Sequence, residues 1–191
     1  YITYTRIFSK RFAMSTKVTY SSADGSLGNI SQFGDGYLIG NYHWKSEKTA
    51  KWSTLFGLKF PFTNSNQKIK GNALPIAYQS SLGTIDLIVG TNLNYKKWDF
   101  NIGLQLPAIN NNRNAYFKEN SVTDEFPSTN LFERKPDALF RTTYTYKMSN
   151  NKFVFKPNVL FLYHLGEDSY ENTLGNRQNI DGSDGLTING N

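Results

Sequence analysis

An unbroken alternation of apolar and polar residues marks the segment Trp98–Leu106, which runs Trp-Asp-Phe-Asn-Ile-Gly-Leu-Gln-Leu. Apolar side chains occupy the even positions, and Asp, Asn, Gly and Gln occupy the odd positions between them. A period of two residues is the period of a β-strand, whose successive side chains point to opposite faces of the sheet. The segment therefore predicts a strand with one apolar face and one polar face.

The same pattern recurs in segments of similar length, which form four predicted hairpins. Their strands are 1–9 with 12–21, 36–44 with 50–61, 84–95 with 98–107, and 137–148 with 152–164. Short turns close the hairpins, and long polar segments connect them at 22–35, 62–83, 108–136 and 165–184. Outer-membrane barrels alternate short periplasmic turns with long extracellular loops in this way. The sequence therefore predicts an all-β fold: an antiparallel up-and-down transmembrane β-barrel.

The two ends of the chain bear on the number of strands. The segment 185–191 predicts the start of a ninth strand, and Tyr1 opens on strand-like sequence without a signal peptide. We expect residues 1–191 to form a single β-barrel domain of eight strands plus the start of a ninth. Since bacterial barrels usually have even strand numbers, we expect a fragment of a larger barrel. Pro157 removes a ladder hydrogen bond from its strand, which predicts a bulge.

In a membrane barrel the polar face lines the lumen. The candidate lumen-facing residues are Lys59, Asp86, Asn92, Asp99, Asn101, Asp137, Arg141, Lys156 and Asn158. Because both signs of charge occur, we expect salt-bridge ladders at least as readily as a charge-selective pore. Apolar residues on the same face predict a narrow or partly plugged lumen; they are Leu55, Ile88, Leu139, Val154, Leu160 and Leu162.

Aromatic residues lie beside the predicted short turns. Trp and Tyr side chains prefer the headgroup level of a bilayer, because one end of the ring system is apolar and the other is polar. The candidate interfacial aromatic girdle consists of Trp44, Trp52, Tyr95, Trp98 and Tyr146. We therefore expect outer-membrane lipid to be a partner and the bacterial cell outer membrane to be the location.

Composition excludes several classes of protein. No apolar stretch approaches the roughly 20 residues that a membrane helix needs, and the mean hydropathy is −0.52. The chain has no cysteine, which excludes disulfides and thiolate metal sites. The net charge is +6, but many of the basic residues lie in short turns, so no nucleic-acid partner is predicted.

Catalytic and metal-binding residues are few. The two histidines are His43 and His164; Ser46 and Ser53 lie near His43 in sequence, but they do not form a convincing nucleophile pair with it. The acidic loop 181–185, with Glu167, Asp168 and Glu171 upstream, suggests either a calcium loop or a plain solvated turn. We therefore predict no enzyme activity, no cofactor and no metal ion.

Several motifs resemble one group of outer-membrane barrels. Gly57-Leu-Lys-Phe-Pro-Phe62, the Leu74-Pro75 loop and Leu82-Gly-Thr-Ile-Asp86 resemble consecutive motifs of the transporters that include phenol meta-cleavage pathway proteins. The segment 181–188 resembles a loop-to-strand entry of the same group, and the Tyr- and Asn-rich composition resembles Bacteroidetes proteins. The chain departs from the group at Thr84, where glycine is usual. The resemblance implies transport of small, hydrophobic molecules and supplies no catalytic residues.

The sequence leaves more than one function open. The leading hypothesis is passive transport of a small solute across the outer membrane. The alternative is a non-transporting structural or partner-binding barrel subunit, which would use the aromatic residues of its long loops to bind proteins. A barrel enzyme and a soluble lipocalin-like barrel are less favoured. The loops 62–83 and 108–136 are long enough to fold into the mouth of the barrel, whereas Asn110–Asn114 is expected to be mobile surface.

Overall fold

Strands make up almost all of the regular structure. The computed structural model describes residues 1–44, 49–148 and 153–190. The helical segments within these ranges are two 3-10 turns, η1 (Ile76–Tyr78) and η2 (Lys118–Asn120). No helix in the described ranges is long and apolar enough to cross a membrane. The predicted turns at 45–48 and 149–151 lie outside the described residues.

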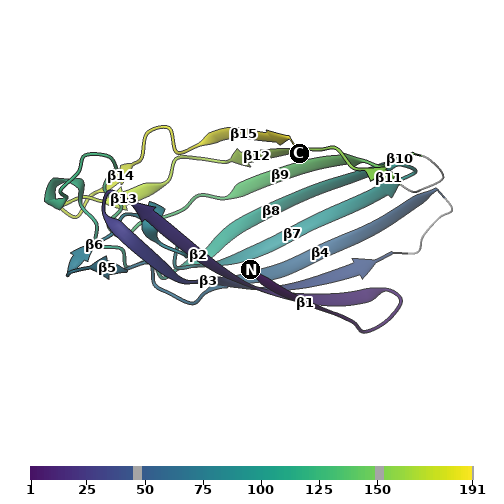
Figure 1. Ribbon diagram of the computed structural model, residues 1–191, viewed down its shortest axis with the longest axis horizontal. Coiled ribbons are helices and arrows are strands. Elements are labelled where there is room, and N and C mark those ends of the chain that lie inside the picture. Colours follow the sequence, from purple (N-terminus) through teal and green to yellow (C-terminus); the bar gives the residue numbers. More distant parts are fainter. Residues whose placement is uncertain (45–48, 149–152, 191) are drawn as a thin grey trace.

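One large sheet contains nine strands that follow each other in chain order, each antiparallel to the next (Figure 1). These are β1 (Ile2–Ile7), β2 (Phe12–Gly25), β3 (Gly28–His43), β4 (Ala50–Pro61), β7 (Thr84–Tyr95), β8 (Trp98–Asn110), β9 (Asp137–Tyr144), β12 (Asn158–His164) and β15 (Gly185–Gly190). The predicted all-β antiparallel meander, including its ninth strand, is confirmed. In the described chain β1 and β15 form the two edges of the sheet and do not pair with each other, so the sheet is open.

The ends of the sheet differ in the length of their connections. At one end, β7 and β8 are joined by the two residues Lys96 and Lys97, while the loops 62–83 and 165–184 extend from the other end. The predicted loop at 22–35 is wrong, because β2 and β3 continue as a hairpin as far as the pair Gly25–Gly28. The Ser22 and Ser31 hydroxyls are 2.8 Å apart across this hairpin. Polar cross-strand pairs of this kind extend the ladder without any apolar alternation.

Three small hairpins complete the structure. The pairs are β5 (Lys68–Ile69) with β6 (Asn72–Ala73), β10 (Tyr146–Met148) with β11 (Phe153–Phe155), and β13 (Ser169–Glu171) with β14 (Arg177–Asn179). In Figure 1, β10–β11 lies at the short-turn end and the other two hairpins lie at the long-loop end.

The bulge predicted at Pro157 is wrong. Thr143 pairs with Asn158 on one side of the interruption, and Tyr146 pairs with Phe155 on the other. Both strands therefore lose two residues of ladder, and no extra residue is inserted. The missing N–H of proline explains the break, while the Pro157 carbonyl still accepts a 3.0 Å bond from the Tyr144 N–H. Proline interrupts the pairing here without shifting its register.

The two faces of the large sheet differ as the alternation predicts. On one face, exposed apolar side chains adjoin across the strands, as in the pairs Leu58–Leu87 and Val89–Leu104. Glycines on this face lie under neighbouring rings: a Cβ added at Gly40 would lie 2.6 Å from the Phe56 ring. The Phe56 ring therefore covers backbone atoms of Gly40, which has no side chain of its own to cover them. The apolar face is continuous, and much of it is exposed.

Packing is tightest among the loops at the long-loop end. The buried apolar side chains Leu74, Tyr78, Tyr116 and Phe132 all come from the connections 62–83 and 108–136. Together with residues 165–184, these connections form a compact group of segments, which we call the loop layer. The strands themselves contribute few buried residues, and most of those lie where the sheet meets the loop layer.

Candidate functional site: the polar face and its junction with the loop layer

The polar face carries a charged cluster beside the loop layer. The Lys59 ammonium lies 2.8 Å from the Asp86 carboxylate and donates a 2.9 Å hydrogen bond to the Thr84 hydroxyl. The exposed fractions of the Lys59 and Asp86 side chains are only 2% and 0%. Asp35 lies 4.0 Å from the same ammonium and accepts a bond from the Ser81 hydroxyl. One cation thus faces two carboxylates at the end of the sheet.

Two β-bulges occur at the strand positions that supply these carboxylates. Gly34 and Asp35 of β3 both lie opposite Thr19, whose hydroxyl accepts a 2.7 Å bond from the Asp35 N–H. Ala108 is the extra residue of β8 opposite the step from Ile85 to Asp86. A bulge bends its strand and redirects the neighbouring side chains. We attribute the convergence of the two carboxylates on Lys59 to these bulges.

A second charged cluster lies on β9 and β12. Asp137 is paired with Arg134 and lies 2.7 Å from the Nδ1 atom of His164. The Nε2 atom of His164 lies 2.8 Å from an oxygen of Asp168 in the following loop. Gln105 connects the two clusters, because it donates to Asp86 and pairs across the strands with Asp137. The result is a polar row that extends from β3 to β12.

A separate polar network lies closer to the short turns. The Asn92 amide donates to Asp99 at 2.6 Å and to Asn101 at 3.1 Å, and Asn101 also donates to Asp99 at 2.6 Å. Alternation on β7 and β8 places all three side chains on the polar face, where their own hydrogen bonds hold them. The sequence predicted the shared face but not the network.

An apolar belt separates the two polar regions. Its residues are cross-strand neighbours, in the order Leu55, Gly90, Gly103, Leu139 and Leu162. Three of the six apolar exceptions predicted for this face thus lie at one level, whereas Ile88, Leu160 and Val154 lie at other levels. Two of the five positions are glycines, so the centre of the belt carries no side chains. The narrowing of the lumen that was predicted from the leucines is therefore limited to the two flanks of the belt.

The remaining predicted polar-face residues lie outside these clusters. Arg141 is exposed on β9, and no ion pair joins it to a carboxylate of the described chain. Lys156 lies in the interruption between β11 and β12 and is exposed, while Asn158 begins β12 opposite Thr143. Salt bridges therefore form at the loop-layer end of this face, at Lys59 and Asp137, and not as a ladder along its whole length.

An asparagine ladder joins the sheet to the loop layer. Asn110, Asn112 and Asn114 each use the side-chain oxygen to accept the N–H two residues further on. The amide of Asn114 donates 2.8 Å bonds to the carbonyls of Ser65 and Leu74. Asn114 is only 1% exposed, so the expectation that this run is mobile surface is wrong. The period-two spacing of the asparagines was the signal available in the sequence.

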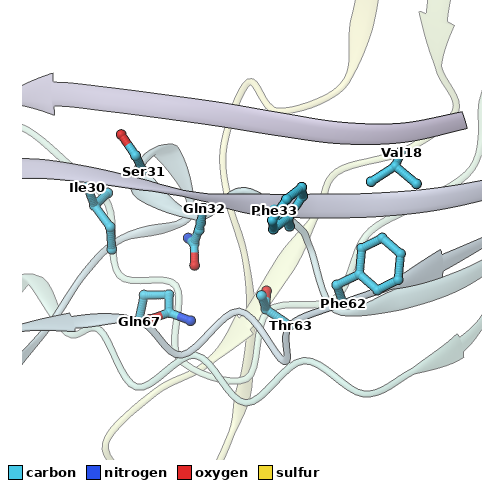
Figure 2. Close-up of a pocket in the computed structure, with 8 residues that line it drawn as sticks. All are labelled: Val18, Ile30, Ser31, Gln32, Phe33, Phe62, Thr63 and Gln67. Atoms are coloured by element: carbon cyan, nitrogen blue, oxygen red, sulfur yellow. The ribbon is translucent and has the colours of Figure 1, made fainter. Parts of the chain in front are cut away.

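A cavity lies where β3 and the chain after β4 separate (Figure 2). Its volume is about 660 Å³, and its lining residues are Val18, Ile30, Ser31, Gln32, Phe33, Phe62, Thr63 and Gln67. The buried Gln32 Nε2 and Thr63 Oγ1 atoms have no hydrogen-bond partner in the described structure. The sequence predicted Val18 in a strand and the other lining residues in the loops 22–35 and 62–83, and it gave no sign of the cavity, since only the divergence of the two segments creates the space.

The predicted girdle residues lie at the short-turn end of the apolar face. Tyr95 pairs directly with Trp98, and the rings of Trp98 and Tyr144 are tilted by 56° with their centroids 4.8 Å apart. The exposed fractions of the five predicted side chains range from 41% to 55%; the residues are Trp44, Trp52, Tyr95, Trp98 and Tyr146. The structure thus groups these rings at one level. Their location at a membrane interface stays a prediction.

Apart from Ser46, the histidine, serine and acidic-loop residues considered for catalysis or metal binding lie on β3, β4 and β12 and in the loop 165–184. His43 pairs with Ser53 across β3 and β4, but no hydrogen bond joins them, and Ser46 lies outside the described residues. No group of three or more His, Cys, Asp or Glu side chains in the described ranges could hold a metal ion. In the acidic loop, the Ser183 hydroxyl accepts a 2.8 Å bond from the Asp168 N–H, as in an ordinary turn-rich segment.

Comparison with family models and with curated sequences gives no match for this chain. No protein-family model matches it, and no curated protein sequence matches it significantly. Its function must therefore be argued from the geometry above.

Proposed function

We propose that this chain forms part of a bacterial outer-membrane β-barrel that lets a small solute pass through its lumen. The observation that carries the proposal is the exposed apolar face. Leu58, Leu87 and Ile102 are 43%, 46% and 56% exposed, although they occupy the middle of long strands. Water-soluble monomers rarely expose continuous apolar surface of this extent. Lipid would cover it at no cost in desolvation.

The open edges of the sheet support closure in the membrane. Unpaired backbone groups at β1 and β15 would each cost several kcal/mol in hydrocarbon, which is why membrane sheets close into barrels. Closure requires either that these two strands meet or that further strands complete the ring. In either arrangement the apolar face lies outward and the polar face becomes the lumen wall.

The polar face supports passage of a small solute. Its two polar regions would border the lumen, and the glycines of the belt between them leave room near Gly90 and Gly103. The loop layer contacts the polar region around Lys59 through the hydrogen bond from Ser81 to Asp35. It would restrict the mouth, so we expect entry to be limited to small molecules.

Conductance in a planar bilayer tests this proposal. The full chain, extracted in detergent, should insert and give discrete conductance steps. Arg141→Glu should shift the permeability ratio towards cations, because it reverses a charge on the polar face. Lys10→Glu changes the same charge in an exposed short turn and should leave the ratio unaltered. A protein that stays monodisperse without detergent would refute the membrane assignment.

A non-transporting subunit is the second candidate. The hydrogen bonds of Asn114 and the buried Tyr116 make the loop layer a rigid body instead of a set of free loops. A rigid outer surface suits binding of a protein partner. Insertion without conductance would refute passage through the lumen and favour this role.

A further inference from the structure

The cavity of Figure 2 results from a local loss of strand pairing. β3 pairs with β4 from Asp35 to His43, whereas Gly28–Phe33 pair with β2 alone. The Phe62 N–H donates a 3.1 Å bond to the Gly34 carbonyl, and beyond this point the chain leaves β3. The sheet therefore has a gap beside residues 30–33, and the cavity occupies it.

The walls of the cavity combine apolar surface with uncharged polar groups. Val18 lies on the apolar face of the sheet, and Phe33 does too, since it pairs with Tyr20. Phe62 adds a third apolar wall from the far side of the gap. No lysine, arginine, aspartate or glutamate is among the lining residues. A ligand with a net charge would find no counter-charge here, so the cavity favours a neutral molecule.

Two polar groups in this cavity lack partners. In Figure 2 the Gln32 amide and the Thr63 hydroxyl extend from opposite sides into the space between β3 and residues 63–67. Both Gln32 Nε2 and Thr63 Oγ1 are buried without a hydrogen bond. Buried polar atoms in proteins are nearly always satisfied, and exceptions mark places where another molecule binds or function requires strain. An amide N–H can be satisfied only by an acceptor.

We propose that this cavity binds a neutral amphipathic small molecule. Its alkyl or aromatic body packs against Val18, Phe33 and Phe62, and its carbonyl, ether or hydroxyl oxygen accepts from Gln32 while bonding to Thr63. A volume of about 660 Å³ suits a small organic ligand. The site lies in a gap of the wall, with Val18 and Phe33 on the apolar face and Gln32, which pairs with Ser21, on the opposite face. It does not require an open lumen and would persist in a barrel that conducts nothing.

Photolabelling of the full chain in dodecyl maltoside tests the site. Benzophenone is a neutral aromatic ketone that reacts with nearby C–H bonds under ultraviolet light, and mass spectrometry locates the adducts. At limiting probe, labelling should concentrate on residues 30–33 and 62–67. Gln32→Leu and Thr63→Val should each lower it there about fivefold, as expected for loss of one hydrogen bond. Thr16→Val, on the same apolar face outside the cavity, should leave it unaltered.

One further variant and one stability measurement distinguish binding in the cavity from a purely structural role of Gln32. Ile30→Trp fills the cavity and should abolish the local labelling. Gln32→Leu should keep or raise the resistance to urea, because it removes an unsatisfied buried group, whereas a purely structural glutamine would lower it. Labelling spread evenly over the apolar face, or unchanged in Gln32→Leu and Ile30→Trp, would overturn the proposal.

The natural occupant could come from the membrane or from solution, since a lipid ester carbonyl and a free ketone offer the same acceptor. Lipid extracted from the purified protein separates the two sources. Lipid retained by the natural chain but lost from Ile30→Trp would assign the site to an acyl chain. Labelling with no retained lipid would assign it to a free solute. Conductance is measured separately, so its absence would refute passage while leaving this site intact.

Discussion

Replacing Lys59 by methionine should strongly destabilise the junction between the sheet and the loop layer. Lys59 is the cation of a buried cluster, and its ammonium lies 2.8 Å from Asp86, whose side chain is fully buried. Lys59→Met keeps most of the side-chain volume but leaves two carboxylates, Asp86 and Asp35, without their shared cation. Of these, Asp86 retains only the hydrogen bond from Gln105.

The expected magnitude follows from the burial of the pair. Removing one partner of a buried ion pair costs about 3–5 kcal/mol, chiefly because the remaining charge is stranded in a medium that solvates it poorly. The exposed fractions of 2% and 0% place Lys59 and Asp86 in that class. The folded-to-unfolded ratio should therefore fall by about two to four powers of ten. Combining Lys59→Met with Asp86→Leu should recover most of the loss, since the stranded charge of the fully buried Asp86 is then removed, while Asp35 keeps the hydrogen bond from Ser81.

Urea unfolding of the full chain in detergent, followed by tryptophan fluorescence, measures this effect. Lys51→Met is the matched control, because Lys51 lies on the same strand and face but is exposed. We expect it to change the free energy of unfolding by less than about 0.5 kcal/mol. If Lys59→Met behaves like Lys51→Met, or if the double variant is less stable than the single one, the buried pair does not hold this junction.

Three other perturbations test separate parts of the structure. Asn114→Ala breaks four buried hydrogen bonds and should lower loop-layer stability by about 2–4 kcal/mol, measured by limited proteolysis, whereas the exposed Asn111→Ala should not. Gly34→Ala should lower the free energy of unfolding in urea by about 1–3 kcal/mol, because its Cβ would lie 2.3 Å from the Ser80 carbonyl oxygen. Gly103→Ala should lower it less, since the nearest contact of its Cβ would be at 3.6 Å, and equal losses in the two variants would contradict the steric reason. In a variant that keeps only Trp98, lipids brominated near the headgroup should quench fluorescence more than lipids brominated near the chain end, and the opposite order would place the ring away from the interface.

The strands and their two faces were determined by the sequence itself. Alternation along Trp98–Leu106 assigns each side chain to a face by a local rule, because successive residues of a strand point in opposite directions. The lengths of the connections also predicted which strands are neighbours, and the meander confirms it. The same local rule failed at 22–35, where the hairpin of β2 and β3 continues through polar residues. Alternation is enforced only where one face contacts an apolar medium.

Only the tertiary structure decided how the junction and the loop layer are built. Asn114 donates to carbonyls 49 and 40 residues away in the chain, and no local pattern specifies such partners. The convergence of Asp35 and Asp86 on Lys59 likewise depends on the register of five strands and on two bulges. Period and composition encode which face a side chain occupies. Which side chains meet is a property of the folded chain, because segments distant in sequence must first be brought together.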